Sequence, residues 1–162
     1  MRGLLIVFVG GGIGSCLRAA LLEWLAGWGG ALPAPVLLAN LSGAFVLGVV
    51  FVLADEAKLL GIEARLFLAV GVLGGFTTFS TFAWGADVLL AGSGGRLVAV
   101  AYLLASVVGG VLSVWLGLGA GRLLRRGSGQ HEATSDNRLG ALEERRPGDS
   151  ARGMGAVEAE DR

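Results

Sequence analysis

Residue types on which catalysis and cross-linking depend are nearly missing from this chain of 162 residues. Its one cysteine, Cys16, allows neither an internal disulfide nor a metal site made of several cysteines. Its one histidine, His131, falls in a polar C-terminal stretch, so the apolar part of the chain has no histidine for catalysis. No nucleophile–base pair is evident there either, and the sequence therefore argues against an enzyme.

Charge is also scarce in the first third of the chain. Between residues 3 and 54 the only charged side chains are Arg18 and Glu23. The formal net charge of the whole chain is zero, which gives no reason to expect a nucleic-acid partner. Apolar sequence is abundant instead, with 54% hydrophobic residues and a mean hydropathy of +0.70. These values indicate an integral membrane protein.

A transmembrane helix needs about 20 mostly apolar residues. Four segments qualify, and they cover residues 4–26, 34–54, 66–91 and 97–121. Because the connections are short, neighbouring helices are expected to be antiparallel. We predict an all-α membrane domain over residues 1–121. The polar composition of residues 122–162 predicts a disordered cytoplasmic tail.

The distribution of Lys and Arg predicts how the chain is oriented, because cytoplasmic loops are enriched in them. With four spans, both termini and the middle loop share one side of the membrane. The basic residues on that side are Arg2, Lys58, Arg65, Arg122, Arg125 and Arg126. The other side has Arg96 alone. We therefore predict a multi-pass protein of the cell membrane with both termini in the cytoplasm.

The third apolar segment has an unusual centre, which reads Gly-Gly-Phe-Thr-Thr-Phe-Ser-Thr-Phe at 74–82. Glycines weaken a helix, and a threonine can cap the start of a new one. We expect one helix to end near Gly74 and another to start near Thr78. Such an interruption frees backbone groups that lipid cannot satisfy, so it is tolerated where it lines a cavity or binds an ion.

The residues of this stretch suit two kinds of ion. Freed carbonyl oxygens suit a cation. Hydroxyl hydrogens, amide hydrogens and the positive edges of aromatic rings suit a small anion. The residues alone therefore favour an anion path beside a fixed cation, while a kinked but inert helix remains the alternative.

Polar side chains occur in the other spans as well. Arg18 continues a stripe with Gly10 and Gly14, and it either faces the bundle interior or extends to the membrane surface. Asn40 lies about two turns into the second span, where an amide either joins helices or lines a path. In the fourth span, polar and small residues share one side: Tyr102, Ser106, Gly109, Gly110 and Ser113.

These features together resemble the Fluc (CrcB) family of fluoride channels. The resemblance covers residues 4 to about 120. Besides the stretch at 74–82, it rests on Gly-Gly-Gly-Ile-Gly-Ser-Cys-Leu-Arg at 10–18, on Asn-Leu-Ser-Gly at 40–43, and on Tyr102 with Ser106.

The resemblance implies a fluoride-selective channel that exports fluoride passively. It also implies an antiparallel dimer of four-helix subunits in the lipid membrane. A sodium ion, structural and not transported, would be held by backbone carbonyls at Gly74 and Thr77. The fluoride path would involve Asn40, Phe79, Phe82, Ser80, Thr81, Tyr102 and Ser106. Arg18 would be structural or lie in a vestibule.

The sequence departs from the family pattern in two respects. Family members often have an acid shortly after the last phenylalanine of the motif, but Ala83, Trp84 and Gly85 follow here, and Asp87 comes later. Family members that form homodimers insert in both orientations and need little charge bias. The bias of six basic residues against one predicts a single orientation. We therefore expect an oppositely oriented paralogue as the dimer partner.

Two other functions compete with a channel. A small secondary transporter of cationic compounds would need a carboxylate within the membrane, and Glu23 is the only candidate. A non-transporting subunit of a membrane assembly would explain the glycine stripes, but not the clustered hydroxyls and phenylalanines.

Overall fold

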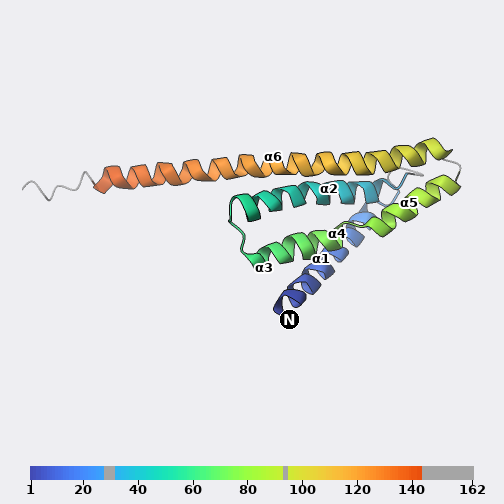
Figure 1. The fold of residues 1–162 in the computed structure, drawn as a ribbon, viewed down its shortest axis with the longest axis horizontal. Coiled ribbons are helices and arrows are strands. Elements are labelled where there is room, and N and C mark those ends of the chain that lie inside the picture. The colour runs from blue at the N-terminus through green and yellow to red at the C-terminus, as the bar shows by residue number, and fades with distance from the viewer. Residues whose placement is uncertain (28–31, 93–94, 144–162) are drawn as a thin grey trace, which may run out of the picture. The chain divides into compact units, whose positions relative to one another are not determined.

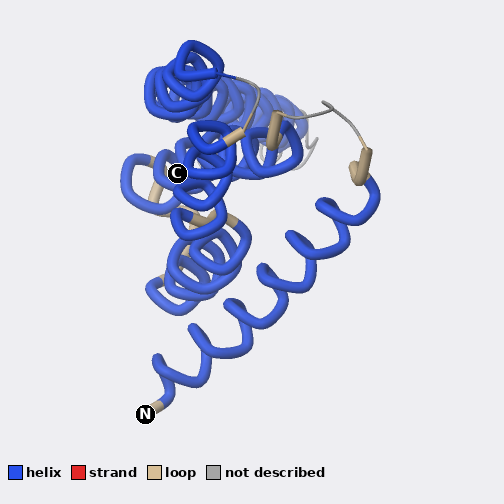
Figure 2. Tube along the Cα trace, turned by 90° about the vertical axis from the view of Figure 1, so that its right-hand side faces the viewer, coloured by secondary structure: helices blue, strands red, loops and turns tan. Residues whose placement is uncertain are grey.

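The structure of the protein is a computed structural model that describes residues 1–27, 32–92 and 95–143. The chain divides into two compact units, Met1–Arg125 and Arg126–Arg162, and the functional residues considered below belong to the first. Every regular element in the described ranges is helical (Figures 1 and 2). The α-helices are α1 (Arg2–Trp24), α2 (Ala34–Phe51), α3 (Ile62–Arg65), α4 (Gly74–Phe76), α5 (Phe79–Ala91) and α6 (Gly95–Glu143). Two π-helical segments, η1 (Val52–Glu56) and η2 (Leu66–Leu73), continue α2 and α3.

Four helical stretches are long and apolar enough to cross a membrane: Arg2–Trp24, Ala34–Glu56, Ile62–Ala91 and Gly95–Arg125. They match the four segments expected from hydropathy, so the prediction of a four-span, all-helical membrane protein is confirmed. Few of their large apolar side chains are buried in the single chain, as expected where lipid or another subunit covers a helix.

The last helix is longer than the predicted fourth span. Helix α6 continues to Glu143, past residue 121, where the sequence predicted the span to end and a disordered tail to begin. Residues 122–143 are thus helical in this structure. Leu, Arg, Glu and Ala, which favour helix, recur in this range. The rest of the predicted tail, 144–162, lies outside the described residues.

Helix α1 packs against the third span through glycines, as the Gly10–Gly14 spacing predicts. A Cβ added at Gly10 would lie 2.7 Å from the carbonyl oxygen of Phe67. One added at Gly14 would overlap the carbonyl oxygen of Val72, and one at Gly75 the carbonyl oxygen of Gly11. Backbone therefore lies against backbone along this contact, and the absence of side chains is what permits it.

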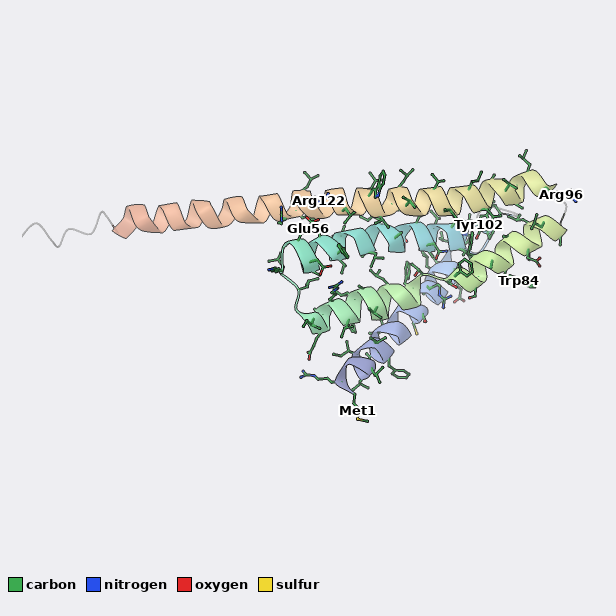
Figure 3. The ribbon with its side chains drawn as sticks, in the orientation of Figure 1. Met1, Glu56, Trp84, Arg96, Tyr102 and Arg122 are labelled. Atoms are coloured by element: carbon green, nitrogen blue, oxygen red, sulfur yellow. The ribbon has the colours of Figure 1, made fainter. Side chains whose placement is uncertain are left out.

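Three ion pairs connect the spans at one end of the bundle. Arg2 pairs with Glu63 at 3.2 Å, which joins the first span to the third. Arg65 pairs with Asp55 at 2.7 Å, which joins the third to the second. The third pair joins Arg122 on α6 to Glu56 at the end of η1, at 2.7 Å (Figure 3). The basic partners in all three pairs, Arg2, Arg65 and Arg122, are among the residues that predict the cytoplasmic side. The orientation of the chain remains a prediction.

We predict that Gly14→Ala lowers the free energy of unfolding by about 1–3 kcal/mol, because the added methyl group must push α1 away from the third span. Unfolding in lipid bicelles measures it. Gly12→Ala on the same helix is the matched control, since a Cβ there meets no described atom within 4 Å. Equal effects of the two substitutions would contradict this account of the contact.

Candidate functional site

The backbone changes conformation within the third span. Helix α4 ends at Phe76, and α5 begins at Phe79. Between them, Thr77 has φ −79° and ψ 153°, and Thr78 has φ −147° and ψ 126°. Both are extended conformations, so Thr78 cannot make the helical hydrogen bond that would join its N–H to the carbonyl of Gly74.

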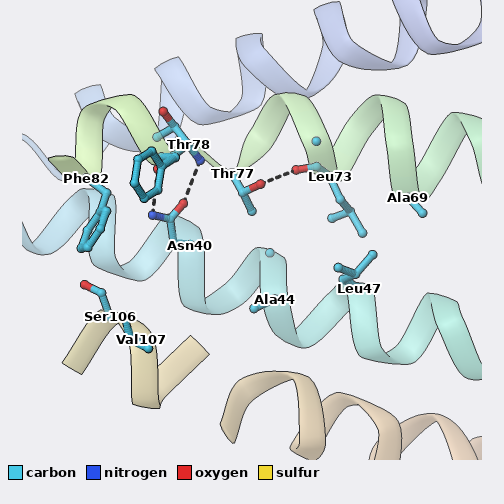
Figure 4. A pocket seen from close by; sticks show the side chains of 13 residues that line it. Asn40, Ala44, Leu47, Ala69, Leu73, Thr77, Thr78, Phe82, Ser106 and Val107 are labelled. Atoms are coloured by element: carbon cyan, nitrogen blue, oxygen red, sulfur yellow. Dashed lines mark hydrogen bonds between the residues drawn. The ribbon is translucent and has the colours of Figure 1, made fainter. Parts of the chain in front are cut away.

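The side chain of Asn40 replaces the missing helical partners of Thr78. Its Nδ2 donates to the carbonyl oxygen of Thr78 at 3.0 Å, and its Oδ1 accepts from the N–H of Thr78 at 2.8 Å (Figure 4). One amide thus satisfies both backbone groups of a residue that lies within a span. Asn40 thus joins α2 to the third span, as one of the two roles considered for it requires, and it also lines the cavity described below.

Two threonine hydroxyls complete the local hydrogen bonds. Thr77 Oγ1 donates to the carbonyl oxygen of Leu73 at 2.9 Å and ends the first helix. Thr78 is the N-cap of α5, and its Oγ1 accepts from the N–H of Thr81 at 3.4 Å. The same Oγ1 lies 3.1 Å from Ser80 Oγ and 3.2 Å from Thr81 Oγ1, so three hydroxyls form one connected group.

A cavity of about 440 Å³ lies beside this interruption. Figure 4 shows side chains from α2, from the third span and from α6 pointing into it. The residues that line it are Asn40, Gly43, Ala44, Leu47, Ala69, Leu73, Gly74, Thr77, Thr78, Phe79, Phe82, Ser106 and Val107. None of these side chains carries a charge. The wall is therefore apolar with a few amide and hydroxyl groups and no carboxylate.

Aromatic rings form one side of the site. The ring centroids of Phe79 and Phe82 are 5.6 Å apart and their planes are tilted by 53°. Phe82 in turn lies 5.5 Å from Tyr102. Phe79 is 79% exposed in the single chain, so its ring is free to contact another molecule.

The residues predicted for the fluoride path and for the sodium site divide into two groups. Those brought together in the cavity wall are Asn40, Gly74, Thr77, Phe79, Phe82 and Ser106. Ser80 and Thr81 do not line the cavity, and their hydroxyls contact the hydroxyl of Thr78, which does. Tyr102 is 1% exposed and packs in an apolar cluster. Its hydroxyl has no hydrogen-bond partner among the described residues.

Arg18 lies outside the cavity wall. It is partly buried, and its Nε has no hydrogen-bond partner within the described ranges. No ion pair links it there to Glu23, the acid nearest to it in sequence. Among the residues that the structure describes, Arg18 therefore has neither a hydrogen-bond nor an ion-pair partner.

Sequence reasoning missed Thr78 and the apolar part of the wall as site residues. A signal existed for some of them, because Gly43 and Leu47 follow Asn40 on one face of α2. No pattern pointed to Ala69 or Val107, because they reach the cavity only through the packing of three helices.

The backbone carbonyls of Gly74 and Thr77 have the chemistry that a sodium site requires. Within the described part of the chain neither oxygen accepts a recorded hydrogen bond. At Gly74 an added Cβ would meet no described atom within 4 Å, so the approach to this backbone is open. No group of three or more His, Cys, Asp or Glu side chains gathers among the described residues. The two positions fit an alkali cation.

Four apolar spans with an uncharged cavity beside a helix interruption define a multi-pass membrane protein. Comparison with known proteins identifies its family. The model of the CrcB-like protein family, also described as Camphor Resistance (CrcB), matches residues 5–118. This chain belongs to the CrcB-like family.

This chain aligns with almost the whole length of three relatives. The fluoride-specific ion channel FluC of Chloroflexus aurantiacus is 40% identical over 123 residues, which are 75% of this chain and 97% of the relative. FluC of Thermus thermophilus is 44% identical over 122 residues, which are 74% of this chain and 94% of the relative. FluC of Roseiflexus sp. is 39% identical over 122 residues, which are 75% and 98% of the two chains.

We predict that Asn40→Ala lowers the free energy of unfolding by about 2–4 kcal/mol, because it leaves two backbone groups of Thr78 unpaired away from water. Unfolding in bicelles measures the change. Ser42→Ala on the same helix is the control, since the Ser42 hydroxyl donates within its own helix. An Asn40→Ala protein as stable as the control would refute the role given to this amide.

Proposed function

We propose that this chain is a subunit of a fluoride-selective channel that lets fluoride leave the cytoplasm passively. The observation that carries the proposal is the cavity wall, in which amide and hydroxyl groups lie beside two phenylalanine rings without any carboxylate. The names of the relatives, each a fluoride-specific ion channel, supply the identity of the anion.

An anion can exchange its water for donors of this kind. Fluoride is small and strongly hydrated, so it needs several hydrogen-bond donors in succession. Asn40 Nδ2 has a second hydrogen beyond the one given to Thr78. Ser106 lies across the cavity, and the ring edges of Phe79 and Phe82 carry partial positive charge. Tyr102, Ser80 and Thr81 would extend this path beyond the cavity.

The direction of transport follows from the membrane potential. Fluoride enters cells as the neutral acid and dissociates inside. A potential that is negative inside then drives the anion outward through an open path, at about 2.3 kcal/mol per charge for 100 mV. No energy source in the protein is required, and the expected benefit to the cell is resistance to fluoride.

We further propose an antiparallel dimer around a structural sodium ion. The interruption in the third span frees the carbonyls of Gly74 and Thr77, and a second chain would contribute the same pair from the other side. Phe79, which is largely exposed in the single chain, would then be covered at the subunit contact. Because the Lys and Arg bias favours one orientation, with both termini cytoplasmic, the second chain is an oppositely oriented paralogue.

The two competing functions have less support. A transporter of cationic compounds needs a carboxylate that faces its substrate, and the cavity wall has none. Glu23 is exposed near the end of α1. A purely structural subunit would not need the uncovered cavity at the interruption.

Fluoride and chloride efflux from proteoliposomes tests the proposal, with valinomycin present to balance charge and ion-selective electrodes as the readout. Vesicles contain the chain alone or co-expressed with an oppositely oriented paralogue. Fluoride efflux without chloride efflux is expected from the co-expressed pair. No fluoride efflux from either preparation would overturn the channel. Efflux from a dimer of the singly expressed chain would instead overturn the requirement for a paralogue.

We predict that Phe79→Ile and Phe82→Ile each reduce fluoride efflux by about tenfold or more, because isoleucine fills space but has no polarised ring edge. Size-exclusion chromatography checks that assembly is intact. Phe8→Ile is the matched control, since Phe8 is 78% exposed on α1 and lies outside the cavity wall. Unchanged efflux in both variants would remove these rings from the path.

Sodium removal gives a separate prediction. Replacing all sodium with N-methyl-D-glucamine on both sides of the membrane should reduce fluoride efflux, since the carbonyls at the interruption lose the cation that orders them. Full efflux after complete removal would defeat the sodium site while leaving the fluoride path intact.

A further inference from the structure

Helices α2 and α6 run parallel and contact each other through glycines. A Cβ added at Gly117 would overlap the carbonyl oxygen of Phe45, and one added at Gly48 would overlap the carbonyl oxygen of Val114. Backbone contacts backbone at these points, so no side chain of one helix is held between side chains of the other. Contacts of this kind allow two helices to approach closely.

The side chains on either side of this contact also lie over glycines. Leu41 faces Gly109, where an added Cβ would be 3.0 Å from Leu41 Cδ2. Val52 faces Gly121, where an added Cβ would be 2.8 Å from Val52 Cβ. Each apolar side chain therefore occupies the space that the missing side chain leaves on the facing helix.

A bidentate ion pair between Arg122 and Glu56 lies at one end of this contact. Arg122 NH2 donates to Glu56 Oε1 at 2.7 Å, and Arg122 Nε donates to Oε2 at 3.1 Å and to Oε1 at 3.2 Å. Among the side chains that the structure describes, this is the only ion pair between the second and fourth spans. The planar guanidinium fits a carboxylate in one geometry, which gives directional specificity that a single point charge lacks.

We propose that the Glu56–Arg122 pair sets the axial register of α6 against α2, and so acts as a positioning element for the cavity. The two helices contribute facing parts of its wall, Asn40, Ala44 and Leu47 from α2 and Ser106 and Val107 from α6. A slip of one residue moves α6 by about 1.5 Å along its axis and turns it by about 100°. Such a slip would take Ser106 out of the wall opposite Asn40.

Cross-linking between introduced cysteines reads the register directly. In a Cys16→Ser background, Leu41→Cys with Gly109→Cys marks the register of the structure. Leu41→Cys with Ala105→Cys or with Ser113→Cys marks α6 displaced by about one turn in either direction. A short thiol-reactive cross-linker should join 41 to 109 in preference to the other two pairs.

The ion-pair variants are then placed in these backgrounds. We expect Glu56→Gln and Arg122→Gln to shift cross-linking toward 105 or 113 by about threefold or more relative to 109. The exchanged pair, Glu56→Arg with Arg122→Glu, should restore the preference for 109. Arg122→Lys keeps the charge but loses the planar guanidinium, so it should give an intermediate shift. If the glutamine variants do not fold, the lysine variant is the one that tests the proposal.

A preference for 109 that is unchanged in the glutamine and lysine variants would overturn the proposal, as would an exchanged pair that fails to restore it. Fluoride efflux of the same variants is the second readout, and this part alone rests on the proposed function. Efflux should fall with the loss of register and return in the exchanged pair. A parent chain that gives no fluoride efflux even when co-expressed with its paralogue would contradict the channel, whereas the cross-linking pattern would still decide the register.

Discussion

Every backbone N–H and C=O within a membrane span must find a partner inside the protein, because hydrocarbon offers none. This constraint makes the interruption at Thr77 and Thr78 the point on which the site depends. The third span leaves helical geometry there, and the amide of Asn40 takes over both bonds that Thr78 loses. An extended residue with freed neighbouring carbonyls can therefore exist at a place where lipid would otherwise exclude it.

The glycine contacts serve the same arrangement. Gly10, Gly14 and Gly75 allow α1 to lie directly against the segment that precedes the interruption. On the other side, Gly48 and Gly117 bring α2 and α6 together. The ion pairs at one end of the bundle add contacts of defined geometry between the same spans.

Hydropathy predicted the four spans because each crosses the membrane with enough apolar residues to be recognised locally. The interaction of Asn40 with Thr78 could not be predicted, because it joins residues 38 positions apart and depends on how α2 packs on the third span. Helical spacing placed Tyr102 and Ser106 on one side of α6. The packing of α5 buries Tyr102, whereas Ser106, one turn further on, lines the cavity. The residue at which α6 ends could not be predicted either, because the polar composition after residue 121 is compatible with helix as well as with disorder.

Amide hydrogen exchange at Thr78, measured in lipid bilayers, tests the central claim that Asn40 holds the interrupted backbone. The account predicts that the Thr78 N–H is protected in the native chain, and that it exchanges rapidly in Asn40→Leu while amides in the middle of α1 remain protected. Rapid exchange at Thr78 in the native chain, or unchanged protection in Asn40→Leu, would contradict it.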